Sequence, residues 1–290
     1  MFTDQINTTD KIAGLLDRLS VSPGLITVRP SHVLFGNQYI FGMYVPRPEW
    51  RTLSAVEADS MSRKGLLQEI SLVRLEPAVL AALRTASGAI ELSVLESPDG
   101  TMRRGVIPHA LGQRVLEHLL GENIHEAQLV SSLLRQVEPA THSDVEEDTG
   151  TVPHGSTTFY PNSDKAIGLH LDTWAHKRDF MQGGRPFRCI VNIGWEPRYV
   201  AFVNAAPDEI SQMILDANPS MEAAKLLEDN PQEWAQRFMS AKGDHPVMRL
   251  KILPGEAYIM DTHACIHDGW AVDRTSADIF VILSYIRDAA

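Results

Sequence analysis

The sequence has only two cysteines, Cys189 and Cys265, in 290 residues. Small secreted domains held by disulfides contain many more, so this count excludes a disulfide framework and favours a reducing cytoplasm. Residues 1–20 contain charged side chains and no long apolar run, which is unlike a signal peptide or a membrane span. We therefore expect a cytoplasmic protein without a membrane partner.

Positive charge is also scarce, because 26 Lys and Arg stand against 37 Asp and Glu, giving a formal net charge of -11. Nucleic acids and anionic membranes both need a basic surface, so neither is an expected main partner. A small-molecule substrate fits the composition better. The oligomeric state is left open.

Short apolar runs separated by turn residues fill the second half of the chain. They lie at 157–160, 167–171, 187–193, 199–203, 250–253, 257–260 and 279–286. This pattern is typical of an antiparallel jelly roll, also called a double-stranded β-helix. The series stops at 205–248, where apolar spacing at 207–215, 221–227 and 231–239 predicts a helical insertion.

The whole chain, 1–290, is predicted to be one mainly β domain with a core at 157–204 and 249–287. Residues 1–150 are expected to add an N-terminal α/β segment. Within that segment, 76–85 predicts a helix that starts at Pro77, and 111–137 predicts mostly helix with an interruption at Gly121.

The stretch from His170 to Asp172 is the most informative in the sequence. On a strand, two residues that lie two positions apart point to the same face, so this pair can chelate a metal. A second histidine would complete a facial triad, which leaves positions open on Fe(II) for a co-substrate and O2. His263 and His267 are both candidates. We prefer His267, because Gly269 would give a sharp exit at the edge of the site.

Four segments together resemble the core of the 2-oxoglutarate- and Fe(II)-dependent oxygenases, in their prolyl-hydroxylase-like branch. They are Tyr160-Pro161, His170-Leu171-Asp172, the Arg-led run 185–195, and His267-Asp268-Gly269 at the end of a strand. The pattern is also similar to the group acting on free amino acids, which includes lysine hydroxylases and halogenases and cyclopropane-forming enzymes. Those halogenases replace the carboxylate ligand with Gly or Ala, so an intact Asp172 disfavours halogenation.

The resemblance implies a catalytic apparatus as well as a fold. Fe(II) would be held by His170, Asp172 and His267, with 2-oxoglutarate and O2 as co-substrates and succinate as a product. The expected reaction oxidises an unactivated C–H bond of a free amino acid or a derivative in natural-product biosynthesis. Hydroxylation is the default outcome, and oxidative cyclisation or desaturation would use the same apparatus.

2-Oxoglutarate needs a cation for its distal carboxylate, and the planar fork of arginine matches a carboxylate well. In the family this residue follows the distal histidine, on or before the last strand, so Arg274 is our first choice. Arg188 and Arg287 are alternatives. Ser276 and Tyr160 are candidate hydroxyl donors to the same co-substrate.

The substrate contacts are less clear from the sequence. Arg103 and Arg104 are candidates for binding a substrate carboxylate, and Trp174 and Asp268 are candidates because each lies close to a predicted ligand. The insertion at 205–248 is either a lid that excludes water or a packing embellishment. The rival interpretation is a non-catalytic, cupin-like metal-binding or sensor protein, which a fourth protein ligand would favour.

Overall fold

The structure, a computed structural model, describes most of the two predicted core segments. The described residues are 17–28, 33–34, 37–38, 42–47, 49–62, 65–94, 102–121, 127–137, 157–158, 166–172, 184–219, 223–270 and 274–288. Tyr160 and Trp174 lie outside these ranges. No helix within them has the length and apolar character needed to cross a bilayer.

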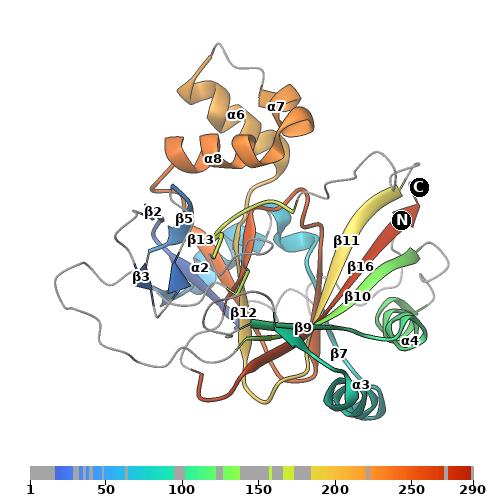
Figure 1. Ribbon diagram of the computed structural model, residues 1–290. Coiled ribbons are helices and arrows are strands. Elements are labelled where there is room, and N and C mark those ends of the chain that lie inside the picture. Colours follow the sequence, from blue (N-terminus) through green and yellow to red (C-terminus); the bar gives the residue numbers. More distant parts are fainter. Residues whose placement is uncertain are drawn as a thin grey trace.

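Two antiparallel sheets form the predicted jelly roll (Figure 1). The larger sheet contains, in spatial order, β7 (Ser71–Arg74), β14 (Glu256–Met260), β11 (Gly184–Asn192), β16 (Asp278–Asp288), β10 (Ala127–Val137), β9 (Met102–Val106) and β8 (Ser93–Val94). The smaller sheet contains β15 (His267–Trp270), β12 (Arg198–Val203), β13 (Val247–Ile252), β1 (Leu19–Ser22) and β6 (Arg51–Thr52). Two short hairpins pair β2 (Leu25–Thr27) with β5 (Tyr44–Pro46), and β3 (Val33–Leu34) with β4 (Asn37–Gln38).

The two faces of the larger sheet belong to two separate cores. On β16, Phe280 and Ile282 join a core shared with the smaller sheet, whereas Val281 and Leu283 join a second core. Successive side chains of a strand point to opposite faces, so one strand supplies both cores. We call the face toward the smaller sheet the inner face and the other the outer face.

Helices cover the outer face of the larger sheet, and three further helices lie beyond one end of the two sheets (Figure 1). The outer face packs on α3 (Pro77–Ala89) and α4 (His109–Leu120), which contribute Leu83 and Leu116 to the second core. Helix α3 starts at Pro77, as predicted. A shorter helix, α2 (Ala55–Ser62), and a 3₁₀ turn, Gly65–Gln68, precede β7.

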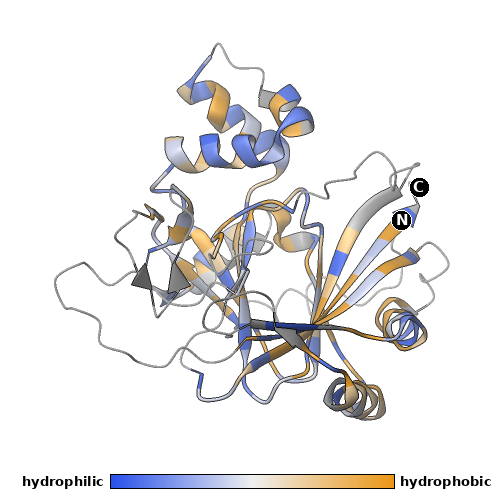
Figure 2. Cartoon of the chain, in the orientation of Figure 1, coloured by the Kyte–Doolittle hydropathy of each residue, from blue (hydrophilic) through white to orange (hydrophobic). Residues whose placement is uncertain are grey.

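The predicted helical insertion forms three helices between β12 and β13. They are α6 (Pro207–Ala217), α7 (Ala223–Asp229) and α8 (Pro231–Ala241). The Asn230 side chain caps α8 by accepting a hydrogen bond from the Glu233 backbone N–H. Trp234 and Phe238 are fully buried in the same core as the smaller sheet. Figure 2 shows apolar and hydrophilic positions mixed along each of the helices, as expected when only one side packs on protein.

The prediction of helix through 111–137 is wrong in its second half. Helix α4 ends at Leu120, and 127–137 is β10, an 11-residue interior strand of the larger sheet. Apolar residues at 129, 130, 133, 134 and 137 have helix-like spacing. Pairing with β9 and β16 overrides that local pattern. The jelly-roll sheet therefore begins before residue 157.

Candidate metal centre

The structure brings His170, Asp172 and His267 together in a buried group. Their candidate ligand atoms all lie within 4.8 Å of one another. Nε2 of His170 lies 3.8 Å from Asp172 Oδ1, and Nε2 of His267 lies 3.8 Å from Asp172 Oδ2. Within the described ranges, no fourth His, Cys, Asp or Glu joins this group.

Backbone pairing fixes the positions of the two histidines. His170 and His267 form an antiparallel bridge in which each backbone N–H donates to the carbonyl of the other, at 3.0 and 2.9 Å. Their rings consequently lie on one side of the paired backbone, with centroids 4.8 Å apart. The backbone N–H of Asp172 is held by the Thr262 carbonyl at 3.0 Å. The spacing of two residues thus directs both side chains of the His170–Asp172 pair to one place.

Hydrogen bonds also set the orientation of each imidazole. His170 Nδ1 lies 2.7 Å from the Gly168 carbonyl, and His267 Nδ1 lies 2.9 Å from the Cys265 carbonyl. A carbonyl only accepts, so each Nδ1 carries the proton and donates it. In the neutral ring, Nε2 then carries the lone pair and faces the centre, which is the form that a metal requires.

Burial and charge favour the deprotonated forms of His267 and Asp172, whereas the charges around His170 favour its protonated form. Burial lowers the pKa of His267 to about 3, and the Asp172 charge opposes this only in part. Burial also disfavours the His170 cation, but the interactions with Asp172 and Asp268 outweigh it and raise that pKa. Burial would raise the pKa of Asp172, yet the Arg188 guanidinium and the two histidines hold it well below its ordinary range. Asp172 is therefore an anion at neutral pH.

Asp172 keeps a buried oxygen available for a cation. Within the part of the chain that the structure describes, Asp172 Oδ2 accepts no hydrogen bond. Arg188 Nε lies 2.9 Å away, but it too makes no hydrogen bond, so the pair is held by charge without donor alignment. A buried carboxylate oxygen and two imidazole lone pairs are the donor set of a facial triad, so the residues fit Fe(II).

The structure separates the two candidates for the distal ligand. His267 begins β15 within the triad, whereas His263 lies in the preceding turn, where its backbone N–H bonds to Asp261. The sharp exit predicted at Gly269, however, is not present. Gly269 is an interior residue of β15 rather than a sharp exit from it.

Gly269 is required for a different reason, which is close packing. A Cβ built on it would collide with Thr157 Oγ1 and would approach Arg198 Nη2 to 3.2 Å. Gly269 lies two positions after His267 and faces the same side of the strand. The Arg198 guanidinium therefore occupies the inner side of β15 one step along from the metal ligand.

Arg198 was missed at the sequence level. It is buried between the sheets, with its guanidinium stacked 3.8 Å from the Phe280 ring centroid. Nε lies 3.4 Å from Asp278 Oδ2, and Nη2 donates to Thr157 Oγ1 at 3.4 Å. Nε and Nη1 make no hydrogen bond to any described residue. The available signal was a charged residue in phase with Val200 and Phe202 at the start of an apolar strand.

Arg274, our first choice for the co-substrate, has its donors directed to the protein. Nη1 bonds to Asp278 Oδ1 at 2.9 Å and to the Pro197 carbonyl at 3.3 Å. Nη2 and Nε bond to the carbonyls of Ala277 and Ser276. Arg274 thus fixes the loop before β16 and neutralises Asp278 from the side opposite Arg198.

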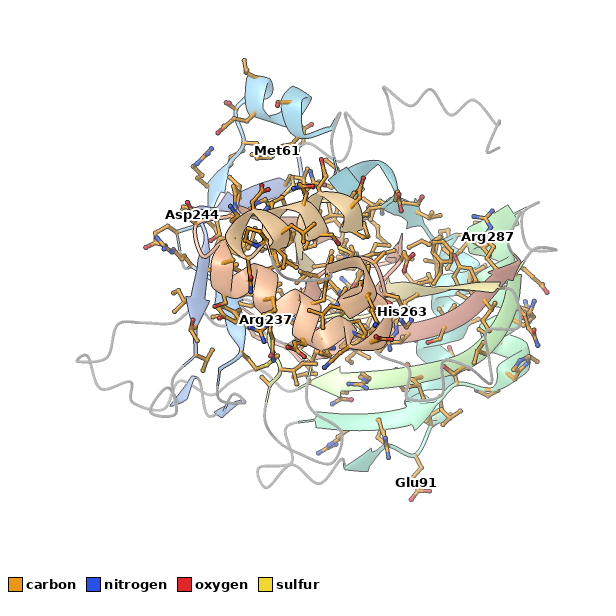
Figure 3. The ribbon with its side chains drawn as sticks, turned by 90° about the horizontal axis from the view of Figure 1, so that it is seen from above. Met61, Glu91, Arg237, Asp244, His263 and Arg287 are labelled. Carbon is orange, nitrogen blue, oxygen red and sulfur yellow. The ribbon has the colours of Figure 1, made fainter. Side chains whose placement is uncertain are left out.

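The remaining predicted residues are spread over the larger sheet and its loops. Arg188 lies beside Asp172 on the inner face of β11. Arg287 lies near the outer end of β16 (Figure 3), and Ser276 lies in the loop before that strand. Asp268 is fully buried next to His267, and its charge acts on His170. Arg103 and Arg104 point to opposite faces of β9, so they are not a joint clamp.

No family model matches the chain, and no curated protein is a significant match. Several solved structures resemble it. HygX from Streptomyces hygroscopicus, with nickel, 2-oxoglutarate and hygromycin B bound, has 10% identity and a TM-score of 0.39, over 80% of this chain and 87% of that one. SnoK, a non-haem alpha-ketoglutarate-dependent carbocyclase from nogalamycin biosynthesis, has 12% identity and a TM-score of 0.44, over 81% and 84%.

A third solved structure belongs to the same chemical class. The Kdo hydroxylase KdoO, a non-haem Fe(II) alpha-ketoglutarate-dependent dioxygenase in complex with cobalt(II), has 13% identity and a TM-score of 0.34, over 76% of this chain and 79% of that one. Each of the three is described either with 2-oxoglutarate bound or as dependent on alpha-ketoglutarate, which is the same compound. All three TM-scores lie below 0.5, so the function proposed below rests on the residues of this site.

Proposed function

We propose that this protein is a non-haem Fe(II)- and 2-oxoglutarate-dependent oxygenase that oxidises an unactivated C–H bond of a small molecule. The observation that carries the proposal is the buried group of His170, Asp172 and His267, with both Nε2 atoms and a carboxylate oxygen directed to one point. When bound, Fe(II) with 2-oxoglutarate and O2 supplies the oxidising power, and 2-oxoglutarate leaves as succinate and CO2. The protein supplies three ligands and leaves the opposite side open.

Arg198 is the residue we assign to the distal carboxylate of 2-oxoglutarate. Its guanidinium lies beside Gly269, which is one two-residue strand step, about 6.6 Å, from His267. That separation suits a five-carbon diacid with its keto-acid end at the metal. Two of its nitrogens lack hydrogen bonds to described residues, and a buried carboxylate would satisfy them. The Thr157 hydroxyl, beside Nη2, is positioned as a second donor.

The charges around Arg198 are consistent with one additional anion. Asp278 lies between two guanidinium groups, since Arg198 approaches Oδ2 and Arg274 bonds Oδ1. Among the buried side chains, two guanidinium groups share one carboxylate. Glu196 approaches Arg274 at 3.6 Å, but from the partly exposed side of the loop. In this assignment Arg274 supports the co-substrate site indirectly, by pairing with Asp278.

We assign the insertion a covering role over the strand that carries the ligands. The Gln232 side chain of α8 donates a hydrogen bond to the Leu171 carbonyl, between the two ligands His170 and Asp172. A cavity of about 460 Å³ lies beside this contact, lined by polar residues of α8 and by Tyr44. Figure 3 shows α8, with Arg237, above the sandwich. Such a cover would limit the access of water to the reacting centre.

The substrate is proposed to be a free amino acid or a derivative from natural-product biosynthesis, within the cytoplasm. Hydroxylation is the default outcome. Oxidative cyclisation, such as cyclopropane formation, and desaturation use the same ligands and remain alternatives. Asp172 leaves no vacant ligand position for a halide, which argues against halogenation. The products differ in mass, since hydroxylation adds one oxygen and the alternatives remove two hydrogens.

Anaerobic addition of Fe(II) and 2-oxoglutarate tests the proposal directly. We expect a visible charge-transfer band, because an open metal face admits a bidentate keto acid. His267→Ala should abolish the band, while His263→Ala, four residues away and outside the triad, should retain it. Folded, iron-loaded protein without a band would contradict the oxygenase and favour a metal-binding or sensor protein. The reverse result for the two variants would show that His263 is the ligand.

A further inference from the structure

Three arginines lie on the inner face of the larger sheet. Arg104 and Arg135 are on the neighbouring strands β9 and β10, and Arg188 is on β11, which β16 separates from β10. Arg104 on β9 is directly opposite Arg135 on β10. Arg135 is opposite Phe280 on β16, and Phe280 is opposite Asn192 on β11, the strand that carries Arg188. Arg188, Ile190 and Asn192 share one face, and Ile190 belongs to the inner core. All three guanidinium groups therefore arise from the side of the sheet that faces the metal centre.

This arrangement is electrostatically unfavourable by itself. Like charges directly opposite on paired strands destabilise a sheet. The pKa of Arg135 is lowered to about 10, first by burial and then by the charge of Arg188, with a smaller effect from Arg104. The charge of Asp172 acts on this pKa in the other direction. A metal ion at the triad would share the Asp172 charge and so strengthen the positive character of the cluster.

The three arginines extend from the surface toward the metal centre. Arg104 is exposed, Arg135 is partly buried, and Arg188 ends 2.9 Å from Asp172. The three arginines thus connect solvent with the metal centre, in a chain whose net charge is -11. Arg198, which we assign to the co-substrate, lies on the smaller sheet and is paired with Asp278. The cation assigned to the co-substrate and the three arginines therefore lie on different sheets.

We propose that Arg104, Arg135 and Arg188 form an oxyanion subsite that binds an anionic group of the substrate and directs the rest of it to the metal. Guanidinium groups bind planar carboxylates and tetrahedral phosphate or sulfate groups with paired hydrogen bonds, so the shared chemistry is an oxyanion. This inference rests on the proposed function, because the same triad supplies the reacting centre. It restricts the substrate class to anionic small molecules.

The test measures ion binding to protein loaded anaerobically with Fe(II) and 2-oxoglutarate. Sulfate serves as the tetrahedral probe and acetate as the carboxylate probe, each titrated by calorimetry. We expect saturable binding of at least one ion, weakened about tenfold or more by Arg135→Gln and by Arg104→Gln. Arg103→Gln is the matched control, because Arg103 is on the same strand but on the outer face, and it should change nothing.

The outcomes separate this inference from the proposed function. Tighter sulfate binding indicates a phosphate- or sulfate-bearing substrate, and tighter acetate binding indicates a carboxylate; both support the subsite. A normal charge-transfer band without saturable ion binding would overturn the subsite and leave the oxygenase intact, as would an equal loss in Arg103→Gln. Absence of the band in folded protein would overturn the oxygenase and this inference with it. The band in each variant also verifies that the site has folded.

Discussion

The inner and outer faces of the larger sheet come from the same strands but differ in composition. On β16, Val281, Leu283 and Tyr285 pack outward in an apolar layer against α3 and α4. The inner face of the same sheet includes Arg135, Arg188 and Asn192 as well as apolar side chains. The period of two along each strand thus separates a face that stabilises the fold from one that surrounds the metal centre. This division predicts that changes on the two faces have different effects.

The largest effect on stability is expected on the outer face. Leu283→Ala removes a fully buried side chain and should lower the free energy of unfolding by about 2–5 kcal/mol, through lost burial and a cavity. Urea unfolding measures this loss. The affinity of the remaining folded protein for 2-oxoglutarate should be unchanged. A weakened affinity would show that the two faces are not independent.

A change to a polar side chain between the two sheets should act mainly on ligand binding. Arg198→Gln removes the cation assigned to the distal carboxylate, which is worth roughly 1.5–3 kcal/mol, or about ten- to a hundredfold in the Kd of 2-oxoglutarate. Anaerobic titration of the visible band measures it. Arg287→Gln, near the C-terminal end of β16, is the control and should have no effect on this Kd. If Arg274→Gln weakened binding more than Arg198→Gln, the first choice made from sequence would be correct.

The smallest of these effects is expected from Gly269→Ala. The new Cβ would collide with Thr157 Oγ1 and press on the Arg198 guanidinium, so stability should fall by on the order of 1 kcal/mol, with weaker 2-oxoglutarate binding. Gly243→Ala is the matched control, because a Cβ there meets no described atom within 4 Å. Thermal unfolding and the same titration compare the two. Equal behaviour would mean that the space beside Gly269 is not needed.

Much of the fold was predictable because local patterns agreed with the tertiary structure. Alternating apolar runs and turns marked β11 to β14 and β16, and prolines at the first turn marked α3, α6 and α8. The error at β10 shows the limit of that reasoning. Its apolar residues suit a helix, and only pairing with β9 and β16 makes the segment a strand. Strand β16 is far from β10 along the chain, and α4 separates β9 from β10.

The site was predictable where ligand spacing and strand geometry coincide. His170 and Asp172 share a face by their spacing alone, and His267 follows a recognisable strand. Arg198 could not be assigned in that way, because its position depends on Phe280 in the opposite sheet and on the missing side chain at Gly269. Spacing favoured Arg274 instead. Only the three-dimensional contacts reveal that the Arg274 donors bond to Asp278 and to nearby backbone carbonyls.

The backbone bridge between His170 and His267 has a consequence for metal uptake. Each residue holds the other by a main-chain hydrogen bond, so the two imidazoles are aligned by the sheet itself and not by the ion. Binding then requires little loss of conformational freedom at the ligands. We therefore expect a chelator to yield an intact protein that recovers its metal quickly. The jelly roll thus provides a preformed metal site whose backbone geometry does not depend on the ion.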